Sequence, residues 1–101
     1  MYFVYIITNK WNNVLYTGST KDLILRVFQH KQKILSSSFT ARYNVGKLVW
    51  YQQYQTYQEA LEQEKRMKRW RRQWKIDLII ENNLDWSDLS LDWDFEEYLT
   101  S

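Results

Sequence analysis

Residues 2–20 read YFVYIITNKWNNVLYTGST, in which two runs of apolar and hydroxyl side chains enclose a short, mostly polar segment. Tyr2–Thr8 is β-branched or aromatic at nearly every position, and Val14–Ser19 has a similar character. Runs of this kind that are separated by Asn and Lys favour strands. The pattern therefore predicts a β-hairpin.

The pairing within this hairpin decides which side chains meet. If the turn is centred between Lys10 and Trp11, Tyr5 lies opposite Tyr16, and the two phenols share one face of the sheet. Gly18 follows two residues later on the same face. Because glycine has no side chain, this position should leave open space where a backbone or a phosphate could approach closely.

The rest of the chain alternates helical and extended patterns. Thr56 and Glu59 form a capping box, in which a hydroxyl and a carboxylate satisfy the first free amides of a helix. The other expected elements are a helix over 21–34 with Thr20 as its N-cap, a loop over 35–46, a third strand over 47–54, a capped helix running to about residue 71 and a helix over 72–81.

Length and composition limit the class of protein. A chain of 101 residues is the size of one domain. The longest apolar run, Phe3–Ile7, is far shorter than the roughly 20 residues of a membrane helix, and no signal-peptide pattern precedes it. We therefore expect a cytoplasmic protein that does not bind membranes. The absence of cysteine excludes disulfides and thiolate zinc sites, and one histidine excludes a multi-histidine metal cluster.

Charge is divided unevenly along the chain. All 14 lysines and arginines lie within residues 1–75 beside only four acids, so this part carries +10, whereas residues 76–101 hold eight acids and no base and carry −8. A cationic body is typical of proteins that bind polyphosphate, because each cation placed on a phosphate releases counterions. The alternative is a solvated basic face with no partner.

A set of polar side chains from three predicted elements could build a site for phosphodiester hydrolysis. Arg26 and His30 are four apart on one helix and project from one stripe. A carboxylate such as Glu64 can hold Mg²⁺, an arginine can neutralise charge on the phosphate, and a phenol can activate water. A tyrosine would need the metal and the arginine nearby to ionise at neutral pH. A small two-layer domain has few ways to keep these elements apart.

Each of these residues also has a purely structural interpretation. A tyrosine in a strand is most often a packing residue. Arg26 and His30 could form a solvated surface with a local pair to Asp22. Glu64 could serve as the i,i+4 partner of Lys68.

The order of these blocks resembles the GIY-YIG nuclease superfamily. Val4-Tyr5-Ile6 and Tyr16-Thr17-Gly18 match the two halves of the name motif, and Arg26, His30 and Glu64 follow at matching places. The chain is most similar to small stand-alone members described as UPF0213 or YhbQ-like proteins. The resemblance covers residues 2 to about 89.

The resemblance implies an α+β fold, with a three-stranded antiparallel sheet flanked by helices in ββαβαα order. It also implies hydrolysis with one divalent ion, Mg²⁺ or Mn²⁺. By resemblance, Tyr5 is the general base or orients the attacking water, and Tyr16 holds the nucleophile or the phosphate. Arg26 stabilises the transition state, and His30 assists proton transfer or binds phosphate. Glu64 is the metal ligand.

Two positions depart from the name motif. Val4 stands where the family has its first glycine, and Thr17 stands where it has isoleucine. Both are packing positions, so we expect activity to survive. Asn83 is expected to support the site as the late asparagine of larger members, and Gly18 as the open position beside the tyrosines.

Residues 65–75 hold seven cations interleaved with Trp70 and Trp74. We expect this segment to follow backbone phosphates, with the indoles free to stack on unpaired bases. The cations assigned to nucleic-acid binding are Lys65, Lys68, Arg69, Arg71, Arg72 and Lys75. Alternatively, the tryptophans face the core. A basic amphipathic helix could also bind an anionic membrane or a calmodulin-like partner.

The acidic end of the chain repeats a short motif. Leu84-Asp85-Trp86 recurs as Leu91-Asp92-Trp93, a spacing that on a helix places both tryptophans on one side. We expect a nuclease domain over 1–83 and a tail over 84–101 that docks on it, partly by charge attraction to the basic helix. A disordered tail is the alternative. Its carboxylates should compete with phosphates for the same cations.

Together these observations predict a monomeric, metal-dependent endonuclease that acts on nucleic acid, with DNA favoured over RNA. The alternatives are a nucleic-acid-binding module without cleavage activity and an interaction adaptor that uses the acidic aromatic tail.

Overall fold

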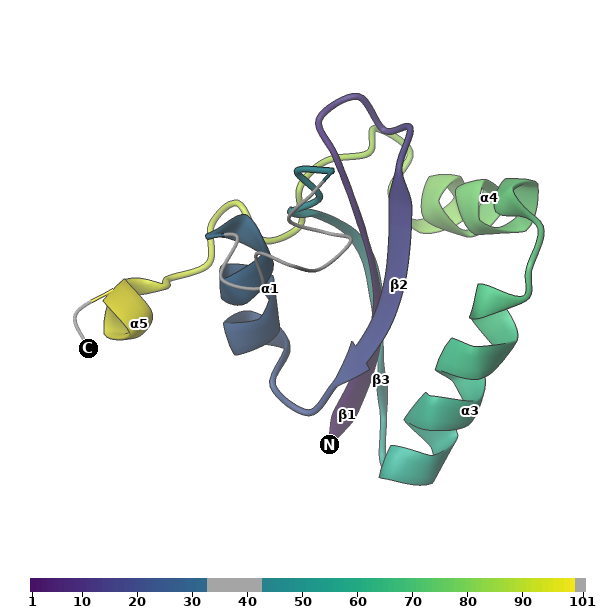
Figure 1. Cartoon of the computed structure of the whole chain (residues 1–101), viewed down its shortest axis with the longest axis horizontal. Helices are drawn as coiled ribbons and strands as arrows, with labels where there is room; N and C mark the ends of the chain where they lie inside the picture. The colour runs from purple at the N-terminus through teal and green to yellow at the C-terminus, as the bar shows by residue number, and fades with distance from the viewer. Residues whose placement is uncertain (33–42, 100–101) are drawn as a thin grey trace.

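The computed structural model describes residues 1–32 and 43–99. Within these ranges, β1 (Tyr2–Thr8), β2 (Leu15–Thr20) and β3 (Lys47–Tyr54) form an antiparallel sheet in the order β2-β1-β3 (Figure 1). The expected α+β fold with a three-stranded antiparallel sheet is confirmed. The third strand has the predicted bounds.

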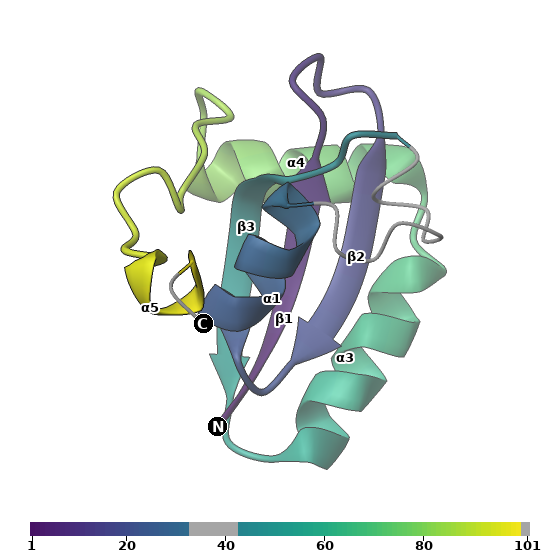
Figure 2. The ribbon, with the colours of Figure 1, turned by 60° about the vertical axis from the view of Figure 1, so that its left-hand side comes forward.

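Helices cover both faces of the sheet. Helix α1 (Leu23–Lys31) packs on one face, and α3 (Tyr57–Lys68) and α4 (Arg72–Asn82) lie on the other (Figures 1 and 2). The predicted ββαβαα order is observed, followed by a short helix, α5 (Glu96–Leu99), that was not predicted. Residues 33–42, which include the end of the helix expected over 21–34 and most of the loop expected over 35–46, lie outside the described residues. Helix α1 is shorter than expected, because it begins at Leu23 and its C-cap is Gln32.

The buried side chains of the described residues form one apolar cluster on each face. Strand alternation sends Val4 and Ile6 toward α3 and α4, and Tyr5 and Ile7 toward α1. The α3–α4 cluster also contains Val49, Trp50, Ala60, Met67 and Ile79. The α1 cluster also contains Leu23, Val27, Val45 and Leu48. The sheet is thus buried on both sides, which fixes its orientation relative to the helices.

The hairpin register differs from the predicted one by two residues. Tyr5 pairs with Gly18, and Tyr16 pairs with Ile7. The connection is longer than assumed because Asn9 organises it: its Oδ1 accepts hydrogen bonds from Asn13 N at 3.0 Å and Val14 N at 3.3 Å. Since the register error is an even number, the two tyrosines still share one face.

Helix starts were predicted with mixed success. Thr56 Oγ1 accepts a hydrogen bond from Glu59 N at 3.2 Å, which confirms the cap of α3. The N-cap of α1 is Asp22, whose Oδ1 accepts from Leu25 N at 3.1 Å, and the predicted Thr20 cap is wrong. The hydroxyl of Thr20 instead accepts from Asp22 N at 3.1 Å and supports the turn before the cap.

The tail is not a helix with both tryptophans on one side. Trp86 has a positive φ of 55°, which is not a helical value, and packs against the α3–α4 cluster. Trp93 and Phe95 pack against the α1 cluster on the opposite face of the sheet. Leu89 N donates to Leu48 O at 2.7 Å, so the backbone crosses at the start of β3. The helical interpretation of the repeat is therefore wrong.

No helix among residues 1–32 and 43–99 has the length and apolar character needed to cross a membrane.

Candidate active site

Tyr5, Tyr16 and His30 form a compact cluster on the α1 face of the sheet. The ring centroids of Tyr5 and Tyr16 are 6.4 Å apart, and the His30 ring lies 5.8 Å from the first and 5.6 Å from the second. Tyr5 Oη and His30 Nε2 are hydrogen-bonded at 3.0 Å, with the donor set by the histidine tautomer. The structure thus brings together three of the predicted site residues.

Helical periodicity explains why His30 reaches the sheet. Leu23, Val27 and His30 are spaced four and three residues apart, so they lie on the face of α1 that is buried against the sheet. His30 is 4% exposed. The solvated-surface interpretation of this histidine is therefore wrong.

Burial determines the protonation of the pair. Burial raises the pKa of the Tyr5 phenol well above its usual value; the nearby Tyr16 raises it further, Arg26 lowers it and Glu64 raises it. Burial, reinforced by the Arg26 cation, lowers the pKa of His30 to about 4. At neutral pH the structure therefore holds a protonated phenol against a neutral imidazole.

Arg26 extends from the same helix, close enough for its charge to act on both Tyr5 and His30. The alternative pair with Asp22 is not observed among the described residues, because the carboxylate of Asp22 caps α1. Arg26 is partly exposed. Its cation is thus available at the rim of the tyrosine cluster.

Glu64 lies on α3, which packs against β1 and β2 from the other face of the sheet. Its Oε1 accepts a hydrogen bond from Ser19 Oγ, and its Oε2 is 2.5 Å from Lys68 Nζ. The side chain is 14% exposed. The i,i+4 pair with Lys68 is thus present. The Glu64 carboxylate, which lies beside the edge strand β2, also raises the pKa of Tyr5.

Comparison with known proteins agrees with this geometry. Residues 1–77 match the family model described as the GIY-YIG catalytic domain. The chain belongs to the GIY-YIG family. This is a family of nucleases, and both tyrosines, His30, Arg26 and Glu64 lie inside the matched range.

Among solved structures, the chain is similar to the UPF0213 protein BH0048 from Bacillus halodurans, determined by NMR in solution. The two are 25% identical, the match covers 91% of this chain and 98% of that one, and the TM-score is 0.54. None of the curated proteins gives a significant match. The resemblance to small stand-alone GIY-YIG proteins is therefore confirmed.

Gly18 has a different part in this GIY-YIG site from the one expected. A Cβ on Gly18 would lie 2.6 Å from Tyr5 Oη and 3.0 Å from Tyr16 Cε1. The space beside the glycine is therefore filled by the Tyr5 ring and is not open to a phosphate. Thr17, at the isoleucine position of the motif, is buried, and its Oγ1 has no hydrogen-bond partner among the described residues.

Asn83 lies at the end of α4, and its side-chain hydrogen bonds go to β3 and to the start of the tail rather than to the tyrosine cluster. Its Nδ2 donates to Val49 O at 3.1 Å and to Ser87 O at 2.8 Å, and its Oδ1 accepts from Ser87 N at 3.1 Å. These bonds join the start of the tail to β3. The geometry gives Asn83 a structural task at this junction.

The basic segment is a corner between two helices. Helix α3 ends at Lys68 rather than near Arg71, and α4 begins at Arg72, whose Nη2 donates to Asn13 O at 2.9 Å. Burial, together with the nearby cations of Lys68 and Arg72, lowers the pKa of Lys75. The corner thus lies against the β1–β2 loop and carries cations from both helices.

A groove of about 500 Å³ runs along this corner and is lined by Lys65, Arg66, Arg69, Trp70 and Trp74, with Glu62. Trp70 is half-buried and packs against the α3–α4 cluster, whereas Trp74 is 52% exposed. Trp70 therefore fits the interpretation as a core residue, whereas Trp74 is exposed, as stacking on a base would require. Trp70 anchors the corner, and Trp74 offers an aromatic surface.

Sequence reasoning missed Ser19 and Asp88. Ser19 lies two residues after Thr17 on the face of β2 that meets α3, and its hydroxyl donates to Glu64; strand alternation alone could have placed it on that face. Asp88 contacts Lys31 at 2.5 Å across 57 residues, and no local pattern indicates that contact.

Proposed function

We propose that this chain is a metal-dependent endonuclease that hydrolyses phosphodiester bonds of nucleic acid, preferably DNA. The observation that carries the proposal is the hydrogen bond of Tyr5 with His30 beside Tyr16, inside the GIY-YIG match. The preference for DNA rests on the family resemblance alone.

The protonation states support a proton relay. A water held at the phenol gives its proton to Tyr5 Oη while the phenol proton passes to His30 Nε2, so the attacking oxygen becomes hydroxide-like and no charge is left on the tyrosine. The lowered pKa of about 4 keeps the His30 imidazole neutral at pH 7, which leaves a ring nitrogen able to accept a proton but makes the ring a weak base in the free protein. A bound phosphate raises that pKa by charge attraction, which strengthens the acceptor.

Arg26 and Tyr16 complete this side of the site. The Arg26 cation opposes the rise of the Tyr5 pKa, so it also favours negative charge that develops near the phenol. Tyr16 lies beside both relay groups, where its hydroxyl can orient a phosphate or the water. Arg26 offsets the charge that builds on the phosphate oxygens.

The donor set fits a single hard cation. No group of three or more His, Cys, Asp or Glu side chains occurs within residues 1–32 and 43–99, so the described part of the chain offers no cage made wholly of protein ligands. Mg²⁺ commonly uses one or two carboxylates together with waters and substrate phosphates. Glu64 would hold Mg²⁺ or Mn²⁺ in this way. The ion would supply Lewis-acid stabilisation of phosphate charge.

The basic corner is the proposed nucleic-acid surface. Its groove combines cations for backbone phosphates with the exposed Trp74, a combination that suits unpaired or distorted strands. Lys68 is shared between this surface and Glu64. A metal ion at Glu64 would therefore compete with the lysine for the carboxylate, and a phosphate would compete with the carboxylate for the lysine.

The test is cleavage of plasmid, single-stranded DNA and RNA with Mg²⁺ or Mn²⁺. Tyr5→Phe and Glu64→Gln each remove one essential group with almost no change in volume, so activity should fall at least about 100-fold for each, as expected for loss of a general base or of transition-state charge stabilisation. Tyr57→Phe and Glu81→Gln are matched controls, because both side chains are exposed, on α3 and α4 respectively, and neither is part of the proposed site or groove. The controls should cut normally.

A wild-type protein that cuts none of these substrates, or active Tyr5→Phe and Glu64→Gln variants, would contradict the assignment. Circular dichroism and salt-dependent binding should be unchanged in the inactive variants. Those measurements separate loss of chemistry from loss of fold.

The second candidate is a nucleic-acid-binding module without cleavage activity. One observation favours it: both carboxylate oxygens of Glu64 are already bonded within the chain, to Ser19 and Lys68. If this arrangement persists in solution, Mn²⁺ should fail to bind to the protein. A DNA oligonucleotide should then bind to the protein without being cut. Calorimetric titration with Mn²⁺ distinguishes the two candidates.

A further inference from the structure

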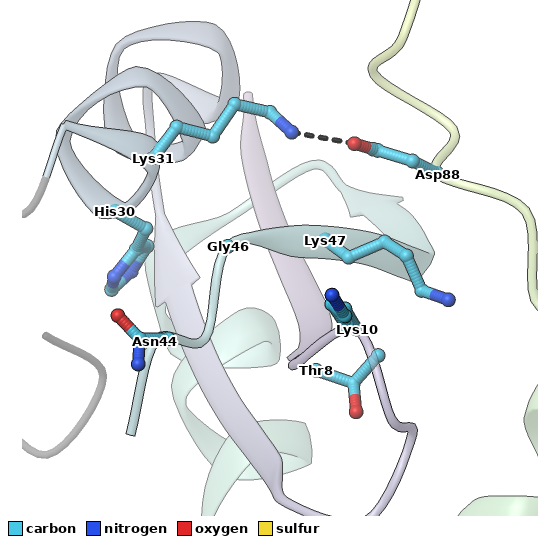
Figure 3. A pocket seen from close by; sticks show the side chains of 8 residues that line it. All are labelled: Thr8, Lys10, His30, Lys31, Asn44, Gly46, Lys47 and Asp88. Atoms are coloured by element: carbon cyan, nitrogen blue, oxygen red, sulfur yellow. Dashed lines mark hydrogen bonds and ion pairs between the residues drawn. The ribbon is translucent and has the colours of Figure 1, made fainter. Parts of the chain in front are cut away.

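A pocket of about 260 Å³ opens beside His30, the histidine of the tyrosine cluster (Figure 3). Lys10 reaches it from the β1–β2 loop, Lys31 from the end of α1 and Lys47 from the start of β3. Thr8 and Asp88 complete the polar wall at this end, and His30 lines the pocket from α1. Segments far apart in the sequence thus converge on one cavity.

The pocket is cationic. Three lysines and one aspartate leave a net charge of +2 at neutral pH, since His30, with a pKa of about 4, is neutral there. The aspartate is already engaged: Asp88 Oδ2 accepts from Lys31 Nζ at 2.5 Å, and Oδ1 accepts from Leu48 N at 3.2 Å and Ser90 Oγ at 2.6 Å. Within the described residues, neither Lys10 nor Lys47 has a carboxylate within ion-pair distance. The pocket therefore offers two cations without a counter-charge.

The size and place of the pocket select the ligand. Its volume lies below the roughly 300–1,000 Å³ of sites for drug-sized molecules, so it suits a small anionic group. His30 forms part of its wall and also contacts Tyr5, so the pocket adjoins the proposed reaction centre. A strand whose scissile phosphate lies at the tyrosines would carry another phosphate near the pocket.

We propose that this pocket is a second phosphate subsite, in which Lys10 and Lys47 bind a phosphate of the substrate strand other than the one that is cleaved. The inference rests on the proposed function for the source of the phosphate. Asp88 positions Lys31 at the pocket wall and offsets its charge. The hydroxyl of Thr8 is engaged with Val14 O at 2.8 Å, so the lysines carry the binding.

The test is binding of a fluorescent oligonucleotide by the full chain in EDTA, which removes cleavage from the measurement. Lys47→Gln and Lys10→Gln should each weaken binding roughly threefold to tenfold at moderate salt and lower the slope of log K against log salt by about 1. Lys21→Gln is the control, because Lys21 is exposed and lies outside the pocket. Lys47→Arg, which keeps the charge, should retain the slope.

A second measurement follows the Gly46 and Lys47 amide resonances during titration with inorganic phosphate. Shifts that disappear in Lys47→Gln support the subsite. Comparison of oligonucleotides with and without a terminal phosphate identifies the source: a loss on both indicates an internal phosphate, and a loss only on the phosphorylated strand indicates a terminal one. Equal slope changes in Lys21→Gln and Lys47→Gln, or a Lys47→Gln slope equal to that of the wild type, would overturn the proposal.

Failure of this proposal is distinguishable from failure of the proposed function. Cleavage with Mg²⁺ that survives while Lys47→Gln binds like the wild type removes only the second subsite. A Lys47-dependent binding slope in a protein that cuts nothing leaves the subsite intact and removes only the nuclease assignment.

Discussion

Gly18 sets how closely the two site tyrosines can lie. Its φ is not positive, so the backbone conformation does not require glycine. Glycine is required because there is no room for a side chain at this position. A Cβ there would meet the Tyr5 ring at 2.6–2.7 Å, and that ring is 1% exposed and packed on all sides. The motif glycine therefore provides space for a phenol.

We expect Gly18→Ala to push the Tyr5 hydroxyl away from His30. Overpacking a tight core site typically costs about 1–3 kcal/mol, so the free energy of unfolding should fall by this amount and cleavage should fall with it. Urea denaturation and the cleavage assay measure the two effects. Gly46→Ala is a matched control for stability, because its Cβ would lie 3.4 Å from Lys31 Cα, near ordinary contact distance. Equal costs at the two glycines would contradict this explanation.

The sequence predicts that Tyr5 and Tyr16 share one face of the sheet, but it does not predict the residue that each one pairs with. Strand alternation alone places both on one face, and any even error in register keeps them there. The true register depends on the hydrogen bonds that Asn9 makes within the connection. Such side-chain bonds lengthen a loop without changing the hydrophobic pattern.

The junction of the tail with β3 depends on one carboxylate. Asp88 accepts hydrogen bonds from Leu48 N, Ser90 and Lys31, and so links the tail to both β3 and α1. Burial raises its pKa, but the hydrogen bonds from Lys31 and Ser90 outweigh burial and leave the pKa below the ordinary value of 3.8. The ionised form is therefore the one that holds this junction.

We expect Asp88→Asn to lower the free energy of unfolding at pH 7 by about 1–3 kcal/mol, the range for losing hydrogen bonds to a charged group. Because the folded-state pKa is depressed, the carboxylate stabilises the fold fully above about pH 4 and loses this effect as pH falls through the folded-state pKa. The gap between wild type and variant should therefore narrow below pH 4. Thermal unfolding from pH 3 to 7 measures it.

The exposed Asp92 provides the control for this change. Asp92→Asn removes the same charge from the tail without touching the junction, so it should leave the melting temperature within about 2 °C at every pH, as surface substitutions usually do. A gap for Asp88→Asn that stays constant down to pH 3 would show that the ionised carboxylate does not stabilise the junction.

At the scale of elements, strong local signals were predictable and competing ones were not. The Thr56 cap of α3 was predicted because a hydroxyl and Glu59 occur at the capping-box spacing. At α1, Thr20 and Asp22 are both good caps, and only the turn geometry decides for Asp22. The start of α4 at Arg72 was predicted, but the end of α3 at Lys68 was not, because the cations that follow Lys68 favour helix.

The basic corner and the far end of the acidic tail lie apart in space. The basic corner of α3 and α4 lies on one side of the sheet, and the tail continues past α1 to α5 on the other (Figure 1). Within the described residues, the tail's ion pair is with Lys31, not with the basic segment, so the expected attraction to the basic helix is not observed. Apolar contacts of Trp93 and Phe95 hold this part of the tail instead.

The two-sided course of the tail could not be predicted from its repeat. Trp86 and Trp93 are seven residues apart, which indicates one face only if the segment is helical. A positive φ at Trp86 and the bonds at Asp88 instead turn the backbone across the start of β3. Tertiary contacts with residues 40 or more positions away decide this path.

Truncation distinguishes packing from charge competition in the tail. A cut after Ser90 removes Trp93 and Phe95, which are half-buried against the α1 cluster, and Tyr98, whose ring lies 5.3 Å from that of Phe28. Full burial of one large side chain contributes about 1.5–3 kcal/mol, so this cut should cost about 2 kcal/mol, or roughly 10 °C in melting temperature. A cut after Asn83 also removes Trp86 and Asp88 and should cost more.

A full-length variant that combines Asp92→Asn, Asp94→Asn, Glu96→Gln and Glu97→Gln removes four charges but keeps the aromatic contacts. If the tail acts by packing, this variant melts like the wild type and its nucleic-acid affinity changes little at 0.1 M salt, where screening acts over about 10 Å. If the tail competes with phosphates, its affinity rises at low salt and the gain disappears at high salt. Because the tail lies across the sheet from the basic corner, we expect the first result, with loss of stability confined to the truncated chains. A rise in affinity without a change in melting temperature would instead make the acidic tail a competitor for the nucleic-acid surface.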